Sequence, residues 1–249
     1  MIPRLLIEGL QEAGQTIALD RDQIHYASRV LRLRPGDAVQ AFDGLGSRWS
    51  AVLAGDGRDA RALQLTAALP GLPESPLKAS LVQCISSAER MDFTIEKAVE
   101  LGVAAIVPVV SARSVVRLDD DRSRKRLAHW QRLVIAAGMQ CGRDLLPTVS
   151  APQTLSDYLA AGSRPRCAWV LAPGAARSLR EAAASAAMVA PLTHCELLVG
   201  PESGLSDDEL MLAQAAGFEA VGLGPRVLRT ETAGLAALAL LQSAHGDLV

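Results

Sequence analysis

From Lys78 onward, short apolar runs alternate with amphipathic stretches, and this alternation constrains the fold more than any other feature of the sequence. Strands that alternate with helices build a mainly parallel sheet with helices on both faces. The sequence therefore predicts an α/β domain over residues 77–249. Its expected strands are 78–84, 104–110, 168–172, 195–199 and 220–223, and its expected helices are 90–101, 119–140, 178–188, 206–216 and 230–244.

The first 69 residues have a different pattern, with several short strand candidates and one stretch of helical spacing. Strands are expected at 4–7, 16–19, 38–42, 48–53 and 61–66, and a helix at 22–32. This combination predicts a small β-barrel over residues 1–69. Three prolines and one glycine in residues 70–76 indicate a stiff linker between this domain and the domain at 77–249.

Three expected strands end in loops rich in glycine and proline. The loops begin near Leu171, Val199 and Leu223. Because ligands of α/β sheets bind beyond the carboxyl ends of strands, these loops indicate a compact site walled by backbone, suited to a nucleoside. Thr230 is expected to cap the last helix, and Ser206 with Glu209 to form a capping box. An ordinary strand–loop–helix joint remains the alternative for the loop after Leu223.

Several functional classes lose support. The formal net charge of −2 excludes a bulk attraction to nucleic acid, so any RNA contact needs basic residues gathered locally. Arg29, Arg32 and Arg34, joined in space by Arg4 and Arg48, could form such a patch, with a solvated helix face as the alternative. Tyr26 and Trp49 could stack on bases, with packing as the alternative.

The sequence lacks the phosphate-loop, dinucleotide-binding and nucleophile-elbow motifs. Its four histidines lack metal-ligand spacing, so no metal is expected. The four cysteines form no close pair and are expected to be reduced and mostly in the core, with a nucleophilic Cys141 left open. No apolar run approaches the length of about 18 residues that a membrane span requires, and the N-terminal stretch is too soon charged for a signal peptide.

Motifs along nearly the whole chain resemble the ribosomal RNA small subunit methyltransferase E family of the SPOUT superfamily. The main ones are Gly222-Leu-Gly-Pro-Arg-Val-Leu-Arg-Thr-Glu-Thr-Ala233 and Val199-Gly-Pro-Glu202. Further matches are His25 to Asp37, Phe42-Asp-Gly44, Glu96 to Gly102, Ser111-Ala-Arg113 and Gln140-Cys-Gly-Arg143. The resemblance implies a PUA-like barrel before an α/β domain with a deep trefoil knot. It also implies a cytoplasmic homodimer that uses S-adenosylmethionine to methylate N3 of one uridine in 16S rRNA, within the small subunit or a late assembly intermediate.

The resemblance also implies the site residues. Arg229 would stabilise charge that develops on the uracil, or else clamp the loop or contact the dimer partner. Glu202 or Glu231 would accept the N3 proton, or else serve in capping or ion pairs. Arg113 and Arg143 would join Arg4, Arg29, Arg32 and Arg34 in contacts to RNA phosphates. The expected cofactor-binding residues are Leu171, Ala172, Pro173, Val199, Gly200, Pro201, Glu202, Leu223, Gly224, Leu228, Arg229, Thr230 and Ala233.

The sequence departs from the family pattern at three positions. Ser203 replaces a glycine, Met139 replaces a glutamate, and Ala112 stands where an acidic residue is common. The last two changes argue against a carboxylate role at those positions. Two alternative functions remain: a non-catalytic RNA-binding factor in ribosome assembly, and a SPOUT methyltransferase that acts on tRNA. The basic stretch at Arg122, Arg124, Lys125 and Arg126 is interpreted as a solvated helix face.

Overall fold

The structure is a computed structural model that describes residues 2–9, 12–56, 60–114, 119–162 and 164–248. The chain forms two units. The N-terminal unit contains Met1–Pro73 together with Gly138–Leu146, and the C-terminal unit contains Glu74–Ala137 together with Pro147–Val249. The chain passes from one unit to the other inside the proline-rich stretch 70–76. No local sequence pattern indicates that Gly138–Leu146 returns to the N-terminal unit.

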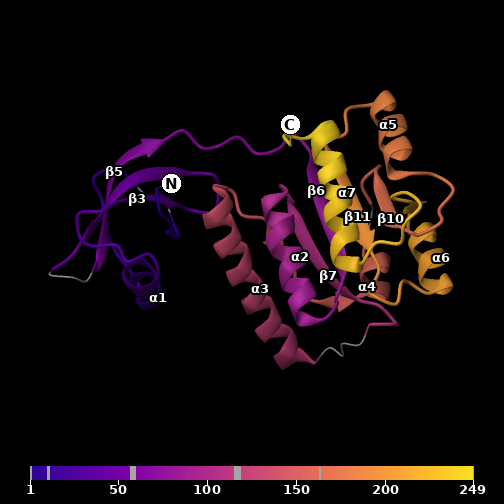
Figure 1. Cartoon of the computed structure of the whole chain (residues 1–249), viewed down its shortest axis with the longest axis horizontal. Coiled ribbons are helices and arrows are strands. Elements are labelled where there is room, and N and C mark those ends of the chain that lie inside the picture. The colour runs from indigo at the N-terminus through magenta and orange to yellow at the C-terminus, as the bar shows by residue number, and fades with distance from the viewer. Residues whose placement is uncertain (1, 10–11, 57–59, 115–118, 163, 249) are drawn as a thin grey trace. The chain divides into compact units, whose positions relative to one another are not determined.

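The N-terminal unit is built on a curled five-stranded sheet (Figure 1). Strand β1 pairs with β3 in parallel, and the remaining pairs are antiparallel. The order across the sheet is β1-β3-β4-β5-β2, with β1 at Arg4–Leu6, β2 at Thr16–Ala18, β3 at Ala38–Phe42, β4 at Arg48–Ala54 and β5 at Ala62–Leu69. Inward-facing residues alternate along β4, which is the burial pattern of a sheet with one face on a core.

The expected helix of the N-terminal unit is present in two parts. Helix α1 covers Arg21–His25 behind an Asp20 capping box, and a π-helical turn, η1, follows at Tyr26–Val30. Trp49 is buried in the core of this unit, and Tyr26 packs against that core. Both aromatic residues therefore have the packing role, and the stacking role is wrong for the buried Trp49.

The segment Gly138–Leu146 joins the N-terminal unit through a buried ion pair. Arg4, which is 6% exposed, pairs with Asp144, whose side chain is fully buried. The Arg4 guanidinium also donates to the carbonyl oxygens of Gly138 and Arg143 at 3.2 and 3.1 Å, and Asp144 accepts from the Leu72 amide at 2.8 Å. The prediction that Arg4 contacts RNA phosphates is therefore wrong, because its charge is used inside the protein.

The C-terminal unit contains a sheet of seven strands, and every pair in it is parallel. The order is β12-β10-β11-β6-β7-β8, and β9 also pairs with β7. The strands are β6 at Lys78–Cys84, β7 at Ala105–Val110, β8 at Thr148–Val149, β9 at Gln153–Thr154, β10 at Ala168–Leu171, β11 at His194–Val199 and β12 at Glu219–Val221. The expected parallel sheet is confirmed.

Helices cover both faces of this sheet (Figure 1). One side carries α2 (Ala88–Glu100) and α7 (Thr230–His245), which pack on each other, and α7 also contacts β6 and β11. The other side carries α4 (Leu155–Ala160) and α6 (Asp207–Ala215), which share a core with Val82, Val170 and Leu198. The remaining helices are α3 (Asp120–Cys141) and α5 (Leu179–Val189). The chain thus leaves the sheet edge at β12 and returns over the central strands as α7.

Strands β8 and β9 and helix α4 are not among the elements that the sequence predicts. Each strand has two residues, and α4 has six. The alternation typical of a strand and the 3.6-residue repeat of a helix therefore recur too few times to be recognised. One local signal was available: the Thr154 hydroxyl accepts from the Asp157 amide at 3.0 Å, which is a helix N-cap. Among the described helices, none is long and apolar enough to cross a membrane.

Candidate cofactor pocket

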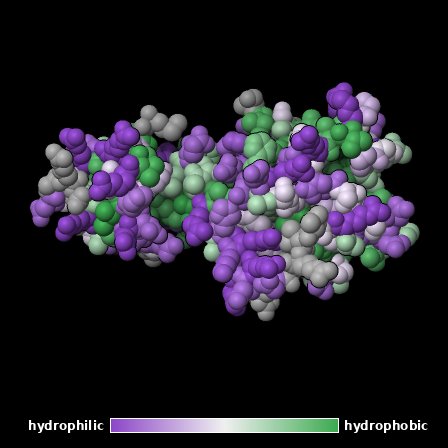
Figure 2. Space-filling model, turned by 60° about the horizontal axis from the view of Figure 1, so that its bottom comes forward, coloured by the Kyte–Doolittle hydropathy of each residue, from purple (hydrophilic) through white to green (hydrophobic). Residues whose placement is uncertain are grey.

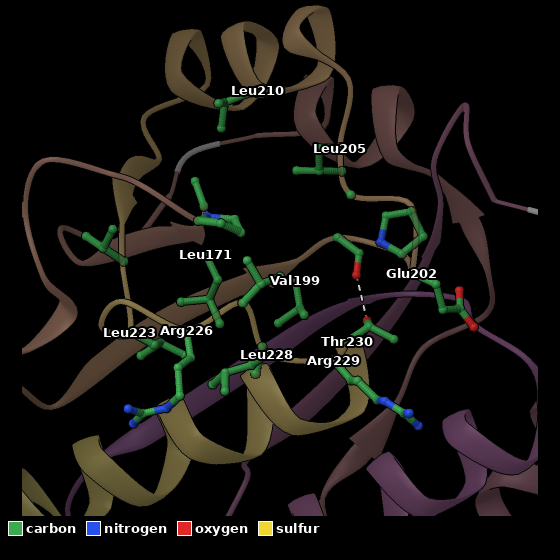
Figure 3. A pocket seen from close by; sticks show the side chains of 18 of the residues that line it. Leu171, Val199, Glu202, Leu205, Leu210, Leu223, Arg226, Leu228, Arg229 and Thr230 are labelled. Carbon is green, nitrogen blue, oxygen red and sulfur yellow. Dashed lines mark hydrogen bonds between the residues drawn. The ribbon is translucent and has the colours of Figure 1, made fainter.

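A cavity of about 540 Å³ opens at the carboxyl ends of β10, β11 and β12. Its volume is in the range of pockets that bind small ligands. Because these neighbouring strands are parallel, the loops that follow them lie at the same edge of the sheet. Figure 3 shows the leucines of these loops, with Leu210 from α6, surrounding the cavity. Much of its wall is therefore apolar side chains and main chain, which suit the uncharged part of a nucleoside.

The loop after β11 is held by the capping box of α6. Ser206 and Glu209 exchange hydrogen bonds, with the Glu209 amide donating to the Ser206 hydroxyl at 3.2 Å and the Ser206 amide to Glu209 Oε2 at 2.9 Å. The other oxygen, Glu209 Oε1, accepts from the Ala112 amide at 2.7 Å. Ala112 therefore contributes its backbone at this point, and the carboxylate there comes from Glu209. The expected capping box is confirmed, and it fixes the end of one pocket wall.

The loop after β12 is tied down at its start and turns at a glycine. The Gly222 amide donates to the Arg177 carbonyl, and the Leu179 amide donates to the Gly222 carbonyl, both at 2.9 Å. Gly224 has a φ of +106°, which only glycine adopts without strain. The expected Thr230 cap is wrong: Arg229 is the N-cap residue, and the Thr230 hydroxyl donates to the Gly200 carbonyl at 2.6 Å.

Charged residues line one rim of the pocket. Arg90, at the start of α2, donates to Glu202 Oε1 at 3.1 Å, and its Nε lies 3.7 Å from Glu231 Oε1. Arg229 Nη1 lies 4.0 Å from the same Glu231 oxygen, and the Arg229 side chain is 78% exposed. Figure 3 shows the Arg229 side chain extending away from the leucines of the pocket. Arg229 is thus a largely solvated cation at the mouth of the cavity.

Glu202 is held as an ion by its neighbours. Partial burial works to raise the pKa of its carboxyl group, but hydrogen bonds from the backbone amides of Glu202 and Ser87 and from Arg90 outweigh it. The pKa therefore lies below its ordinary value of 4.5. A carboxylate with a lowered pKa is a weaker base, so the geometry favours an ion-pair role for Glu202 over proton acceptance.

Comparison with known proteins assigns the chain to a family. Residues 73–242 match the RNA methyltransferase domain, and residues 19–61 match the RNA methyltransferase PUA domain. The ribosomal RNA small subunit methyltransferase E of Buchnera aphidicola subsp. Schizaphis graminum is 32% identical, with 99% of this chain and 98% of the relative covered. The chain belongs to the ribosomal RNA small subunit methyltransferase E family.

Solved structures agree with this assignment. The ribosomal RNA small subunit methyltransferase E of Neisseria gonorrhoeae, bound to S-adenosyl methionine, is 37% identical, with a TM-score of 0.88 and complete coverage of both chains. A Legionella pneumophila protein, also solved with that cofactor, is 32% identical, with a TM-score of 0.91 and complete coverage of both. The PUA-like and α/β architecture that the family resemblance implied is thereby confirmed.

Every residue that the family resemblance assigned to cofactor binding lines the pocket. The structure adds Arg226 and Val227, which lie within the motif Gly222 to Ala233 but were not assigned to the cofactor. It also adds residues outside the quoted motifs, namely Arg90, Gly204, Leu205, Leu210 and Val221. Gly204 and Leu205 continue the loop that begins at Gly200, so extending that motif to the Ser206 cap would have found them. Arg90 and Leu210 come from other helices, and no local signal in the sequence joins them to the three loops.

The expected RNA-contacting arginines have different surroundings. Arg29, Arg32 and Arg34 are exposed in the N-terminal unit, whose visible face carries many hydrophilic side chains (Figure 2). Arg113 is exposed in the C-terminal unit, and its Nη1 donates to the carbonyl oxygens of Ser203 and Leu205, both at 3.4 Å. Arg113 therefore braces a pocket loop as well as facing solvent. Arg143 is half-buried in the N-terminal unit.

The cysteines have no partners for disulfides. Cys84, Cys167 and Cys195 are buried and Cys141 is exposed, and all four thiols are free. Burial raises the pKa of Cys84 and of Cys195 to about 12, so both are neutral thiols. Within the described residues, no group of three or more His, Cys, Asp and Glu side chains is placed to hold a metal ion.

Proposed function

We propose that this protein uses S-adenosylmethionine to methylate N3 of a specific uridine in small-subunit ribosomal RNA. The observation that carries the proposal is the pocket at the strand ends, lined by the residues that the family motifs assign to the cofactor. Its relatives support the same reading, because the family member from Neisseria gonorrhoeae was solved with that cofactor bound.

The pocket fits the proposed cofactor by its chemistry. Leu171, Leu223 and Leu228 offer apolar surface to a purine, and the glycine loops leave backbone groups accessible at the wall. When bound, the cofactor supplies an electrophilic methyl group on a sulfonium. The chain's part is to hold the target base beside that methyl group and to exclude competing water. The base must leave its stack to reach a cavity of this kind.

Arg229 is the proposed catalytic residue. It is the N-cap residue of α7, at the solvent-exposed pocket mouth, and a guanidinium there is placed to stabilise negative charge that develops on the uracil oxygens as N3 loses its proton to solvent water. Because N3 is a poor nucleophile while protonated, this stabilisation favours the reactive form. The ion pairs of Glu202 and Glu231 with Arg90 favour a supporting role for both carboxylates.

The N-terminal unit is proposed to bind the RNA. The match to the RNA methyltransferase PUA domain and the exposed Arg29, Arg32 and Arg34 support this role. We further infer a cytoplasmic homodimer, a trefoil knot in the C-terminal unit, and a substrate presented by the small subunit or a late assembly intermediate. The return of α7 from the edge strand β12 to the central strands is consistent with a knotted path.

Two measurements test the proposal. Titration calorimetry with S-adenosylmethionine should give saturable 1:1 binding per chain, and no binding would refute methylation. Mass mapping of 16S rRNA from cells with and without the gene should show a methyluridine that disappears in the deletion strain. A methyluridine that persists there would remove the proposed substrate. A modification lost from tRNA instead would favour the tRNA alternative, and nucleosides of the large-subunit RNA serve as the control.

A further inference from the structure

A buried glutamine in the central sheet reaches the wall of the pocket. Gln83, on β6, has no exposed surface, and its Nε2 donates to the Thr230 hydroxyl at 2.9 Å and to the Cys84 carbonyl at 3.1 Å. Thr230 in turn donates to the Gly200 carbonyl at 2.6 Å, the bond drawn dashed in Figure 3. These contacts form a polar chain from the middle of the sheet to the loop after β11.

The chain of hydrogen bonds has one direction. The Cys84 carbonyl is only an acceptor, so the amide group that faces it must be the NH2 and not the oxygen. The same NH2 donates to Thr230, and the single hydroxyl hydrogen of Thr230 is then directed to Gly200, whose carbonyl is also only an acceptor. The orientation of the Gln83 amide therefore decides where the Thr230 hydrogen points.

The hydrogen bond between Thr230 and Gly200 joins two of the segments that line the pocket. Gly200 is the first residue after β11, and Thr230 is the first residue of α7. The loop is tightly packed at this point, because a Cβ on Gly200 would lie 3.1 Å from the Leu205 amide nitrogen. The distance between the loop and the helix is thus set by a hydroxyl whose orientation is fixed from the core.

Gln83 is not explained by packing alone. Its Oε1 is buried and has no hydrogen-bond partner among the described residues. Burying an unpartnered carbonyl oxygen opposes folding, and a methionine of similar length would fill the space without that cost. The amide at this position therefore stabilises the site at some expense to the core.

We propose that Gln83 is a positioning residue for the cofactor pocket, acting through Thr230 to hold the loop at Gly200 against the start of α7. The inference rests on the proposed function, since it concerns the same pocket. It assigns Gln83 no contact with the cofactor. Its effect is on affinity for S-adenosylmethionine, because the pocket wall must be in place before the ligand binds.

A double-mutant cycle tests the coupling, with cofactor affinity measured by calorimetry. Thr230→Val removes the hydroxyl at nearly constant shape and should weaken binding about tenfold, and Gln83→Met should weaken it about threefold. The double variant should bind no more weakly than Thr230→Val alone, because the amide then has no hydroxyl to orient. Thr230→Ser keeps the hydroxyl and should stay within about twofold of the wild type. Fully additive losses would overturn the proposal.

A second variant tests the donor-to-acceptor direction of the hydrogen bonds from Gln83 through Thr230 to Gly200. In Gln83→Glu, the neutral carboxyl group can donate to Thr230, whereas the ionised carboxylate can only accept and would draw the hydroxyl hydrogen away from Gly200. Burial should raise the pKa of the new carboxyl group toward neutrality. Affinity should therefore be near that of the wild type at about pH 6 and about tenfold weaker at about pH 8.5, a change that neither the wild type nor Gln83→Met should show.

The two hypotheses fail separately. If the wild type does not bind S-adenosylmethionine, the proposed function fails. If the wild type binds and folded Gln83→Glu follows the wild-type pH profile, only the role of Gln83 fails. Urea unfolding of each variant identifies any that do not fold. If Gln83→Glu is one of them, the cycle with Thr230→Val and Gln83→Met decides the matter.

Discussion

The two units of the protein use their polar residues in different ways. In the C-terminal unit, the pocket is formed by three loops that directly follow neighbouring strands, and most of its lining belongs to those loops. In the N-terminal unit, the role of an arginine depends on whether it reaches Gly138–Leu146, a segment remote in sequence. Arg4 and Arg48 both approach Asp144, whereas Arg29, Arg32 and Arg34 are exposed. A site made by loops at a sheet edge can be predicted from neighbouring residues in the sequence. A site made by paired charged side chains cannot, because the partners are distant in the sequence.

The largest expected effect comes from the remote segment. Asp144→Ala would leave Arg4 buried without its carboxylate and should lower the free energy of unfolding by about 3–5 kcal/mol. Urea unfolding followed by circular dichroism measures it. The matched control is Asp121→Ala, which removes a solvent-exposed ion pair with Arg124 and should leave the midpoint unchanged. Similar midpoints for the two variants would contradict the distinction between the units.

The next effect concerns the one charged side chain proposed to act in the backbone-built pocket. Arg229→Ala should lower kcat by about 100- to 1,000-fold, as expected when a donor to developing charge is lost. Its affinity for S-adenosylmethionine should change by less than about threefold, because the side chain is largely solvated. Single-turnover methylation and calorimetry separate the two quantities. Equal losses in both would assign Arg229 to cofactor binding instead.

The backbone wall itself is tested by a methyl group. Gly200→Ala would place a Cβ 3.1 Å from the Leu205 amide nitrogen and 3.2 Å from Leu205 Cγ, so binding of S-adenosylmethionine should weaken about tenfold. Gly222→Ala is the control, because its nearest neighbour would lie 3.6 Å away, in ordinary contact. Calorimetry should show little change there. Equal losses of affinity for Gly200→Ala and Gly222→Ala would mean that the space around each glycine does not decide the effect.

The smallest expected effect is on RNA binding. Arg34→Ala should weaken binding of a 16S rRNA fragment a few-fold and lower the slope of log affinity against log salt by about 0.7–0.9, the contribution of one phosphate contact. Fluorescence anisotropy at several salt concentrations measures the slope. Arg122→Ala, on the helix face interpreted as solvated, should leave it unchanged. If Arg122→Ala weakened RNA binding and Arg34→Ala did not, the RNA-binding surface would be assigned to the C-terminal unit instead.

The sequence predicted the regular elements well wherever a period repeats. Strands β3 and β6 begin and end at the expected residues, and the order of strands and helices after Lys78 follows the alternation of apolar and amphipathic stretches. The prediction failed at 148–160, where two strands and a helix are each too short to show a period. It also could not give strand order, because β10 lies between β12 and β11 through contacts that no local pattern records.

In the candidate site too, the parts set by local sequence were predicted, and the parts set by distant partners were not. The loops at Leu171, Gly200 and Leu223 were found from glycine, proline and the ends of strands, and family motifs supplied their ligand. The errors concern side chains whose partners are distant in sequence. Arg4 pairs with a residue 140 positions away, and Thr230 donates to a carbonyl 30 positions away instead of capping its own helix. Neither partner can be inferred from neighbouring residues.

The placement of Gly138–Leu146 in the N-terminal unit has a consequence for synthesis on the ribosome. Because the chain emerges from its N-terminal end, Arg4 and the sheet strands β1 to β5 are made long before Asp144. Until residue 146 has left the exit tunnel, the charge of Arg4 has no carboxylate to meet and must stay hydrated. The first unit to be translated is therefore completed only when more than half of the chain exists, and a fragment that stops at Pro73 would lack a part of its own interior.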